Sequence, residues 1–232
     1  MANKIILPYR LELTVIYDCN QECPYCAHFV PYLKGIVPLR EIEKTCEEWS
    51  NLIEPQQVFI MGGETTIHPD IIEIIYLFNR HWRNVVLATN GTTLHEMPRA
   101  FFEAVERTNT WIDISFNDYT QKYGSEIRQF VQDKNMSNCR FYNKRFTKQY
   151  QIIDNQAVPF HNPRRCCGNT IFTLLNNRLY KCTTLPRALQ CYQMEDRYSV
   201  TIHDDIEKFV KRVYSCPFCP GHLYYLDDTP VC

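Results

Sequence analysis

Hydrophobic and polar positions between residues 11 and 143 follow two alternating periods. Runs rich in β-branched and aromatic residues predict five strands, over 11–17, 57–63, 84–91, 110–116 and 138–143. Between them, apolar residues recur at helical spacing over 38–53, 68–82, 97–107 and 121–132. Regular alternation of strand and helix predicts a parallel sheet with right-handed crossovers. Because five strands fall short of a complete eight-unit barrel, we predict an open, partial (β/α) barrel of the α/β class.

The pattern changes after about residue 150. The segment 166–182 predicts a β-hairpin, with β-prone TIFTLL, a turn at Asn176-Asn177 and then RLYKC. A short helix is expected around residues 204–214. We therefore expect a core over residues 1–148 and a small cysteine-rich extension over residues 149–232.

Composition narrows the class of protein. The 232 residues are 45% hydrophobic, which is enough for a sizeable core, and the formal net charge is −1 with a pI of about 6.6. Such a balance gives no electrostatic footprint for nucleic acid or for an anionic membrane. The first residues lack a signal-peptide pattern, and no apolar run reaches transmembrane length. We expect a cytoplasmic protein with neither nucleic-acid nor membrane partners.

Twelve cysteines are unusual for such a chain. In a reducing compartment they predict metal sites rather than disulfides. They fall into two groups, with only Cys46 and Cys139 between them: 19, 23 and 26, then 166, 167, 182, 191, 216, 219 and 232. The first group has three thiols, so a zinc site would need a fourth ligand such as His28. A cubane [4Fe–4S] cluster held by three thiols instead keeps one iron open for chemistry.

Polar motifs follow four of the predicted strands. DCNQEC, GGET, TNG and SFND each come where a strand ends. The carboxyl ends of parallel strands meet at one edge of a sheet, and ligands bind there. The sequence therefore predicts one site assembled from all four motifs.

These motifs resemble those of the radical S-adenosyl-L-methionine (SAM) superfamily. The resemblance covers about residues 10–143 and comprises Cys19-x3-Cys23-x2-Cys26 with an aromatic at Tyr25, Gly62-Gly63-Glu64, Thr89-Asn90-Gly91, and Ser115. It implies that Cys19, Cys23 and Cys26 hold three irons of a [4Fe–4S] cluster, while SAM chelates the fourth. Reduction would then cleave SAM to methionine and a 5′-deoxyadenosyl radical.

The resemblance also implies roles for individual residues around SAM. Tyr25 would shield the cluster, and Gly62 and Gly63 would let the backbone approach the ligand. Glu64 would accept hydrogen bonds from the ammonium group. Asn90 and Ser115 would contact the carboxylate or ribose. Arg128 is a further candidate for the carboxylate, or else a solvated charge on a helix.

The second cysteine group resembles the twitch extension of some radical SAM enzymes. There a hairpin and a later Cys-x2-Cys hold an auxiliary iron–sulfur cluster, which implies the ligands Cys166 or Cys167, Cys182, Cys216 and Cys219. Asn177 stands where that pattern has glycine, and asparagine tolerates the same left-handed conformation. A zinc site built from the same positions is the alternative.

The compact chain is most similar to radical SAM members of the 2-deoxy-scyllo-inosamine dehydrogenase type. That likeness implies hydrogen abstraction from a small polar substrate, with the auxiliary cluster handling an electron and a flavodoxin or ferredoxin as electron donor. Maturation of a ribosomally made peptide is one alternative, and a non-enzymatic zinc-binding adaptor is another. Residues expected near a substrate pocket are Tyr32, His161, Arg164 and Arg187.

Overall fold

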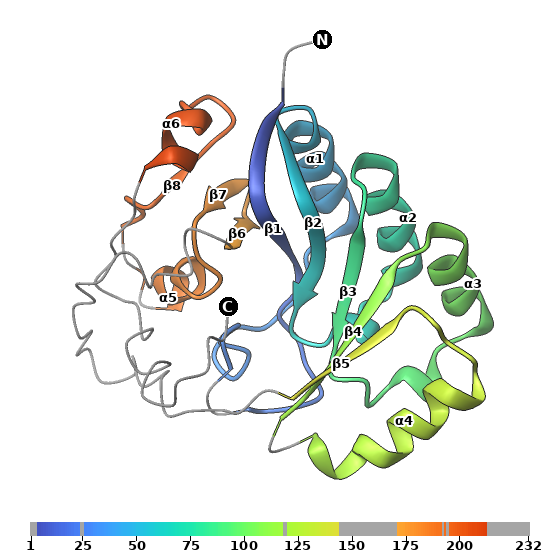
Figure 1. Cartoon of the computed structure of the whole chain (residues 1–232). Coiled ribbons are helices and arrows are strands. Elements are labelled where there is room, and N and C mark those ends of the chain that lie inside the picture. The colour runs from blue at the N-terminus through green and yellow to red at the C-terminus, as the bar shows by residue number, and fades with distance from the viewer. Residues whose placement is uncertain are drawn as a thin grey trace.

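A single eight-stranded sheet organises the chain (Figure 1). The structure is a computed structural model that describes residues 4–23, 26–117, 120–143, 171–191, 193 and 195–212. The strand order is β5-β4-β3-β2-β1-β6-β7-β8. The strands are β1 (Ile5–Ile16), β2 (Ile53–Gly62), β3 (Val85–Thr89), β4 (Trp111–Phe116), β5 (Cys139–Asn143), β6 (Ile171–Leu175), β7 (Arg178–Tyr180) and β8 (Ser199–Val200).

The first five strands are parallel neighbours, each joined to the next through a helix. These helices are α1 (Leu39–Ser50), α2 (Ile71–His81), α3 (Arg99–Thr108) and α4 (Gly124–Asp133). The expected alternation of strand and helix is confirmed. The mixed α/β sheet agrees with an open, partial barrel.

Two strands begin earlier than expected. β1 starts at Ile5 and pairs there with Ile53, a residue that the helical pattern had placed in the preceding helix. Pairing is irregular between Leu7 and Arg10, around Pro8, which has no N–H to donate. The proline and bulge interrupt the alternation that a sequence pattern needs, so this first part of the strand was missed.

The predicted hairpin continues the main sheet. β6 lies parallel to β1, with Arg10 opposite Ile171 and Leu13 opposite Leu174. β7 and β8 then extend the sheet in antiparallel fashion. Two short helices, α5 (Leu185–Cys191) and α6 (Ile206–Lys211), complete the described C-terminal part. The sheet is therefore continuous across the boundary expected near residue 148.

The hairpin turn has the predicted conformation and an unexpected anchor. Asn176 and Asn177 both have left-handed φ values, +50° and +57°, as a tight two-residue hairpin turn requires. The Asn177 Oδ1 accepts a hydrogen bond from Trp49 Nε1 at 2.7 Å, and its Nδ2 donates to Glu48 at 2.5 Å. Asparagine thus ties the turn to α1, which glycine could not do.

The two faces of β1 differ in character. Leu11, Leu13 and Val15 belong to the apolar core that includes residues of α1 and α2. Because side chains alternate along a strand, Glu12 and Thr14 lie on the opposite face. Both are buried, and α5 covers them, on the side of β1 away from α1 (Figure 1). This second, concave face is polar beside β6, whereas over β2 and β3 it carries the apolar cluster of Phe59, Met61 and Val86.

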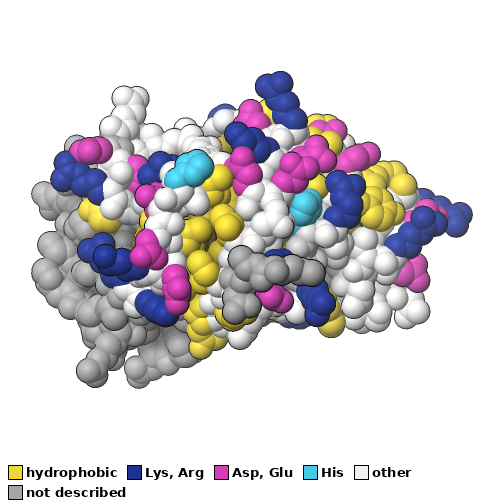
Figure 2. All heavy atoms as spheres, turned by 90° about the horizontal axis from the view of Figure 1, so that it is seen from above, with side chains coloured by type: hydrophobic (Ala, Val, Ile, Leu, Met, Phe, Trp, Pro, Cys, Tyr) yellow, Lys and Arg dark blue, Asp and Glu magenta, His cyan; other side chains and the backbone are white. Residues whose placement is uncertain are grey.

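Surface charges are intermixed. Seen from above the view of Figure 1, Lys and Arg side chains alternate with Asp and Glu, and a band of hydrophobic side chains lies between them (Figure 2). None of the helices in the described part of the chain combines the length and apolar character needed to cross a bilayer.

Candidate active site

The ends of β1 and β2 approach each other very closely. The Gly63 amide donates to Ile16 O at 2.7 Å, and a Cβ on Gly62 would lie 2.1 Å from that same oxygen. A Cβ on Gly63 would lie 2.0 Å from Asp18 O. No side chain fits at either position, so these glycines are needed for the chain to pack against itself directly before Cys19. Their expected close approach to SAM stays a prediction.

Glu64 is a buried structural centre of this rim. Its Oε1 accepts hydrogen bonds from Thr66 N, Thr66 Oγ1 and Thr89 Oγ1, at 3.1, 2.6 and 2.5 Å. Its Oε2 accepts from Asn90 N at 2.7 Å. Burial raises the pKa of the carboxyl, while these four donors act to lower it. The carboxylate thus holds the ends of β2 and β3 together, and its expected contact with the SAM ammonium is untested.

Asn90 connects the end of β3 to the cysteine loop. Its Nδ2 donates to Asn20 Oδ1 at 2.8 Å and lies 4.0 Å from Cys19 Sγ. Its Oδ1 accepts from the Thr92 amide at 2.9 Å. The side chain is therefore fixed beside the first thiol, at the place where the motif order predicted a ligand contact.

The three N-terminal thiols share one electrostatic environment. Burial is the main cause that raises the pKa of Cys19 to about 12 and that of Cys23 to about 11, and the charge of Cys26 raises both further. Two N–H donors work in the opposite direction: Gln21 N, 3.4 Å from Cys19 Sγ, and Asn117 Nδ2, 3.9 Å from Cys23 Sγ. Donors directed at sulfur are typical of thiolates that bind iron–sulfur clusters.

The three thiols of the loop match the ligand number of a SAM-binding cluster. Within the described residues, no group of three or more His, Cys, Asp or Glu side chains is placed to hold one metal ion. In a cubane each cysteine binds a different iron, so its thiols need not converge on one point. Cys19, Cys23 and Cys26 would hold that cluster. Tyr25 lies outside the described residues.

Ser115 and Arg128 occupy the β4–β5 side of the rim. Ser115 is half-buried and pairs with Tyr142 in the sheet. The Arg128 guanidinium lies 4.3 Å from the ring centroid of Phe141 and 5.1 Å from that of Phe116. Arg128 is exposed on α4, which agrees with a solvated helix charge, and its guanidinium adds a cation–π contact with two stacked rings. Its expected contact with the SAM carboxylate stays a prediction.

Asn117 is a site residue that sequence reasoning missed. It follows Ser115 by two positions, within the SFND motif that marked the end of β4. Its amide reaches Cys23, although 94 residues separate the two positions in the chain. The motif could have pointed to it, but only tertiary structure shows which side chain of the motif faces the thiols.

Of the expected auxiliary-cluster ligands, only Cys182 is described. It follows β7, where its sulfur accepts from the Leu185 amide at 3.4 Å, and it packs against a small apolar cluster with Leu189 and Tyr180. The remaining candidates lie outside the described residues: Cys166, Cys167, Cys216 and Cys219. The auxiliary cluster stays a prediction.

Arg187 is the most informative of the expected pocket residues. It comes from α5, is fully buried, and donates to Thr14 Oγ1 and to the Thr183 carbonyl. Burial lowers its pKa, and the Glu12 carboxylate is the strongest opposing influence. Tyr32 is exposed, while His161 and Arg164 lie outside the described residues.

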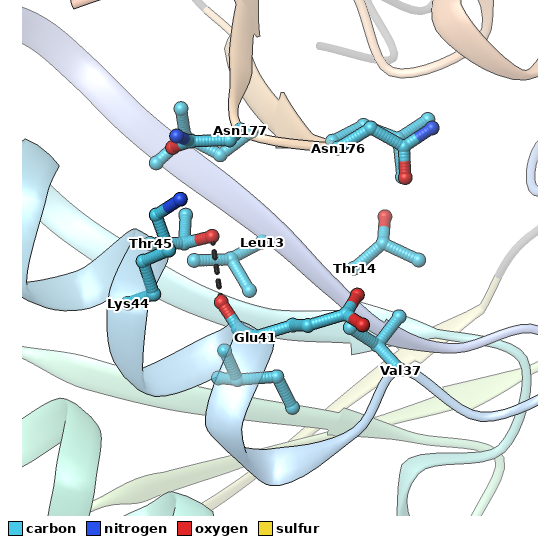
Figure 3. A pocket seen from close by; sticks show the side chains of 11 residues that line it. Leu13, Thr14, Val37, Glu41, Lys44, Thr45, Asn176 and Asn177 are labelled. Carbon is cyan, nitrogen blue, oxygen red and sulfur yellow. Dashed lines mark hydrogen bonds between the residues drawn. The ribbon is translucent and has the colours of Figure 1, made fainter.

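Two cavities flank these elements. One, of about 340 Å³, lies between α1 and the hairpin turn, where Glu41, Lys44 and Asn177 line it (Figure 3). The other, of about 360 Å³, is lined by Asn20, Thr92 and residues of α4. Only the second adjoins the polar rim, because Asn20 and Thr92 both bond to Asn90.

The family model described as the radical SAM superfamily matches residues 13–153. The chain belongs to the radical SAM superfamily. It is therefore an enzyme of the class that uses a [4Fe–4S] cluster and SAM, in agreement with the thiol loop and the polar rim.

Relatives and solved structures are similar to different extents. The probable GTP 3′,8-cyclase of Methanothermobacter thermautotrophicus is 31% identical over 133 residues, covering 52% of this chain and 43% of that protein. The PqqA peptide cyclase of Gluconobacter oxydans is 29% identical over 132 residues, covering 52% and 33%. The chain thus spans less than half the length of these curated relatives. The crystal structure of BtrN in complex with AdoMet and 2-DOIA covers 95% of this chain and 90% of that one, at a TM-score of 0.60 and 12% identity, a likeness of fold alone.

Proposed function

We propose that this radical SAM enzyme abstracts a hydrogen atom from a small polar metabolite, such as a sugar or cyclitol, and oxidises it. The observation that carries the proposal is the set of buried polar side chains on the concave face of the sheet. Glu12, Thr14 and Arg187 are buried there beside β6, and Asp113 pairs with Arg140 further along at 2.8 Å. Charged and hydroxyl side chains on an enclosed face suit a substrate that carries many polar groups.

The rim residues bind and orient in this proposal. When bound, the reduced cluster supplies the electron that cleaves SAM into methionine and the hydrogen-abstracting 5′-deoxyadenosyl radical. Asn90 and Ser115 are proposed to hold SAM's polar groups, while Glu64 keeps the Asn90 backbone in place. Asn117 and Gln21 stabilise negative charge on the thiols of the loop.

The proposed oxidation removes one hydrogen atom, one proton and one electron from the substrate. A hydrogen atom leaves the carbinol carbon for the 5′-deoxyadenosyl radical, the hydroxyl proton goes to a base, and one electron goes to an acceptor, which leaves a ketone. An auxiliary iron–sulfur cluster that includes Cys182 is the proposed acceptor. A flavodoxin or ferredoxin is the proposed donor of the electron that starts the reaction.

Peptide maturation is the second candidate. Among the relatives are the PqqA peptide cyclase and the subtilosin biosynthesis protein AlbA of Bacillus subtilis, whose names indicate work on peptides. The probable GTP 3′,8-cyclases are named for a small polar substrate instead, and they match this chain at up to 35% identity. The polar concave face favours the small molecule. The third candidate, a non-enzymatic zinc-binding adaptor, is not better supported than either enzyme.

An anaerobic assay with SAM and a reductant tests the proposal. Reconstituted enzyme should form 5′-deoxyadenosine slowly alone and faster with its substrate, and a polyol labelled with deuterium at the carbinol carbon should transfer that label into 5′-deoxyadenosine. Label transfer from a precursor peptide, and from no polyol, would favour maturation instead. Absence of 5′-deoxyadenosine from protein with a full cluster would contradict the radical chemistry itself.

A further inference from the structure

Buried polar atoms without hydrogen bonds gather at one place on the concave face. Of the described residues, seven have such side-chain atoms, and four of these atoms belong to neighbouring residues of β1, β6 and α5: Arg10 Nε, Glu12 Oε1, Thr173 Oγ1 and Arg187 Nε. Glu12 and Thr173 are directly opposite each other in the β1–β6 pairing. We call these four residues the β1–β6 polar cluster.

Hydrogen bonds fix the geometry of the cluster. Glu12 Oε2 accepts from Thr183 Oγ1 at 2.6 Å, and Arg187 donates to Thr14 and to the Thr183 carbonyl. Glu12 Oε1 forms an ion pair with Arg10 Nη2 at 2.8 Å, although the geometry is not that of a hydrogen bond. Each charged side chain is therefore fixed by some of its polar atoms, while Nε of Arg10, Nε of Arg187 and Oε1 of Glu12 have no hydrogen bond within the described residues.

Buried polar atoms without hydrogen bonds destabilise a folded protein. Buried donors and acceptors nearly always have a partner, and each one without a partner disfavours the folded state. The fold does not require them here, because a valine would occupy the position of Thr173 without an unpaired hydroxyl. Several buried atoms without hydrogen bonds at one place thus indicate a polar partner that the described residues do not supply.

The kinds of atom define the partner. The cluster offers two N–H donors from Arg10 and Arg187, a carboxylate acceptor from Glu12, and a hydroxyl from Thr173 that can do both. The Glu12 carboxylate would repel an anion, and the guanidinium groups of Arg10 and Arg187 would repel a cation. A neutral hydroxyl group both donates and accepts, so vicinal hydroxyls match this mixture.

We propose that the β1–β6 polar cluster is a binding subsite for the hydroxyl groups of a neutral polyol, and that it positions the substrate on the concave face of the sheet. This inference rests on the proposed function and specifies the substrate class of the same site. The connection to the thiols runs through β1, which carries Glu12 and Thr14 and leads directly into the loop of Cys19.

Thr173→Val separates a binding role from a structural one. The reconstituted, SAM-loaded enzyme is titrated anaerobically with myo-inositol and scyllo-inositol, and binding is followed by saturation-transfer NMR. We expect wild-type enzyme to bind at least one of them, and Thr173→Val to bind it at least fivefold more weakly. Its melting temperature should equal or exceed that of the wild type, because an unpaired buried hydroxyl is removed. A purely structural threonine would leave binding unchanged.

Thr110→Val is the matched control. Thr110 is equally buried, but its hydroxyl is hydrogen-bonded to Asn79 and Thr108. It lies directly before β4, at the end of that strand away from Ser115. This variant should melt at a lower temperature and bind the inositol normally. The inference is overturned if the wild type binds neither inositol, if only ordered water occupies the cluster in a crystal soaked with them, or if Thr173→Val binds as tightly as the wild type. In each of these cases, formation of 5′-deoxyadenosine by the wild type would still support the radical chemistry, so that only the polyol subsite would be rejected.

Discussion

Glu64 and Asn90 are joined by a hydrogen bond of 2.7 Å from the Asn90 amide to Glu64 Oε2. The bond links the loop after β2 to the loop after β3, 26 positions along the chain. It sets the Asn90 side chain, which in turn contacts Asn20 in the thiol loop. A residue that the motif order assigned to SAM thus organises the rim before any ligand arrives.

We expect Glu64→Gln to destabilise the fold. An amide NH₂ would replace one acceptor oxygen, so at least one of the buried donors from Thr66, Thr89 or Asn90 would lose its partner, at a cost of about 1–3 kcal/mol. Anaerobic urea denaturation measures the change, and Glu73→Gln on the exposed side of α2 is the control. Unchanged stability combined with weakened SAM binding would show a ligand contact and no structural role.

Asn177→Gly tests the anchor between the hairpin and α1. Glycine keeps the left-handed turn but leaves the buried Trp49 Nε1 unpaired, so we expect a loss of about 1–3 kcal/mol in the free energy of unfolding. Asn176→Gly is the matched control: that residue is exposed with φ +50°, and its replacement should stay within about 0.5 kcal/mol. Equal effects at both positions would mean that the side-chain bonds of Asn177 contribute nothing.

Iron and acid-labile sulfide contents test the two cluster assignments separately. A chain with two cubanes should hold about eight irons, and Cys19→Ser and Cys182→Ser should each lose about half. Only Cys19→Ser should also abolish the change that SAM makes in the electron paramagnetic resonance spectrum. The half-buried Cys139→Ser should keep all the iron. Full iron content in Cys182→Ser would remove that residue from the auxiliary site.

Asn117→Asp should lower the reduction potential of the SAM-binding cluster by tens of millivolts. The change removes an N–H donor 3.9 Å from Cys23 Sγ and adds negative charge, and both effects disfavour the more negative reduced state. The acceptor for the Thr120 amide is kept. Potentiometric titration followed by electron paramagnetic resonance measures the shift. Asn109→Asp, which adds the same charge at the end of α3, should leave the potential unchanged.

His81 should make stability depend on pH in a mild range. Burial, and then the charge of Arg80, lower its pKa below the ordinary value, and its Nδ1 lies 3.0 Å from Ser50 Oγ. Because the folded state disfavours the charged imidazole, stability is lost as the pH falls through the unfolded-state pKa of about 6.5. Urea denaturation between about pH 8 and pH 5.5 should therefore show a steeper decline for the wild type than for His81→Asn. Parallel declines would exclude His81 as the cause.

The local pattern was sufficient for the order of the elements from β1 to β5 and for the hairpin of β6 and β7, but it missed α5 and β8. Periodicity placed β2 to β5 and α1 to α4 within a few residues of their observed ends, because each element buries one face and that face repeats along the chain. The turn at Asn176-Asn177 followed from the conformational preference of asparagine. The motifs at the strand ends predicted one rim because all carboxyl ends of a parallel sheet share an edge.

Tertiary structure alone decided which groups meet. Which donors surround Glu64, which amide reaches Cys23, and how β6 pairs with β1 depend on contacts between positions 25 to 161 residues apart. Sequence spacing carries no information on such distances. The glycines at 62 and 63 were recognised as special from the sequence, but their physical reason, oxygen atoms about 2 Å from a missing Cβ, lies in the packing of one strand end against another.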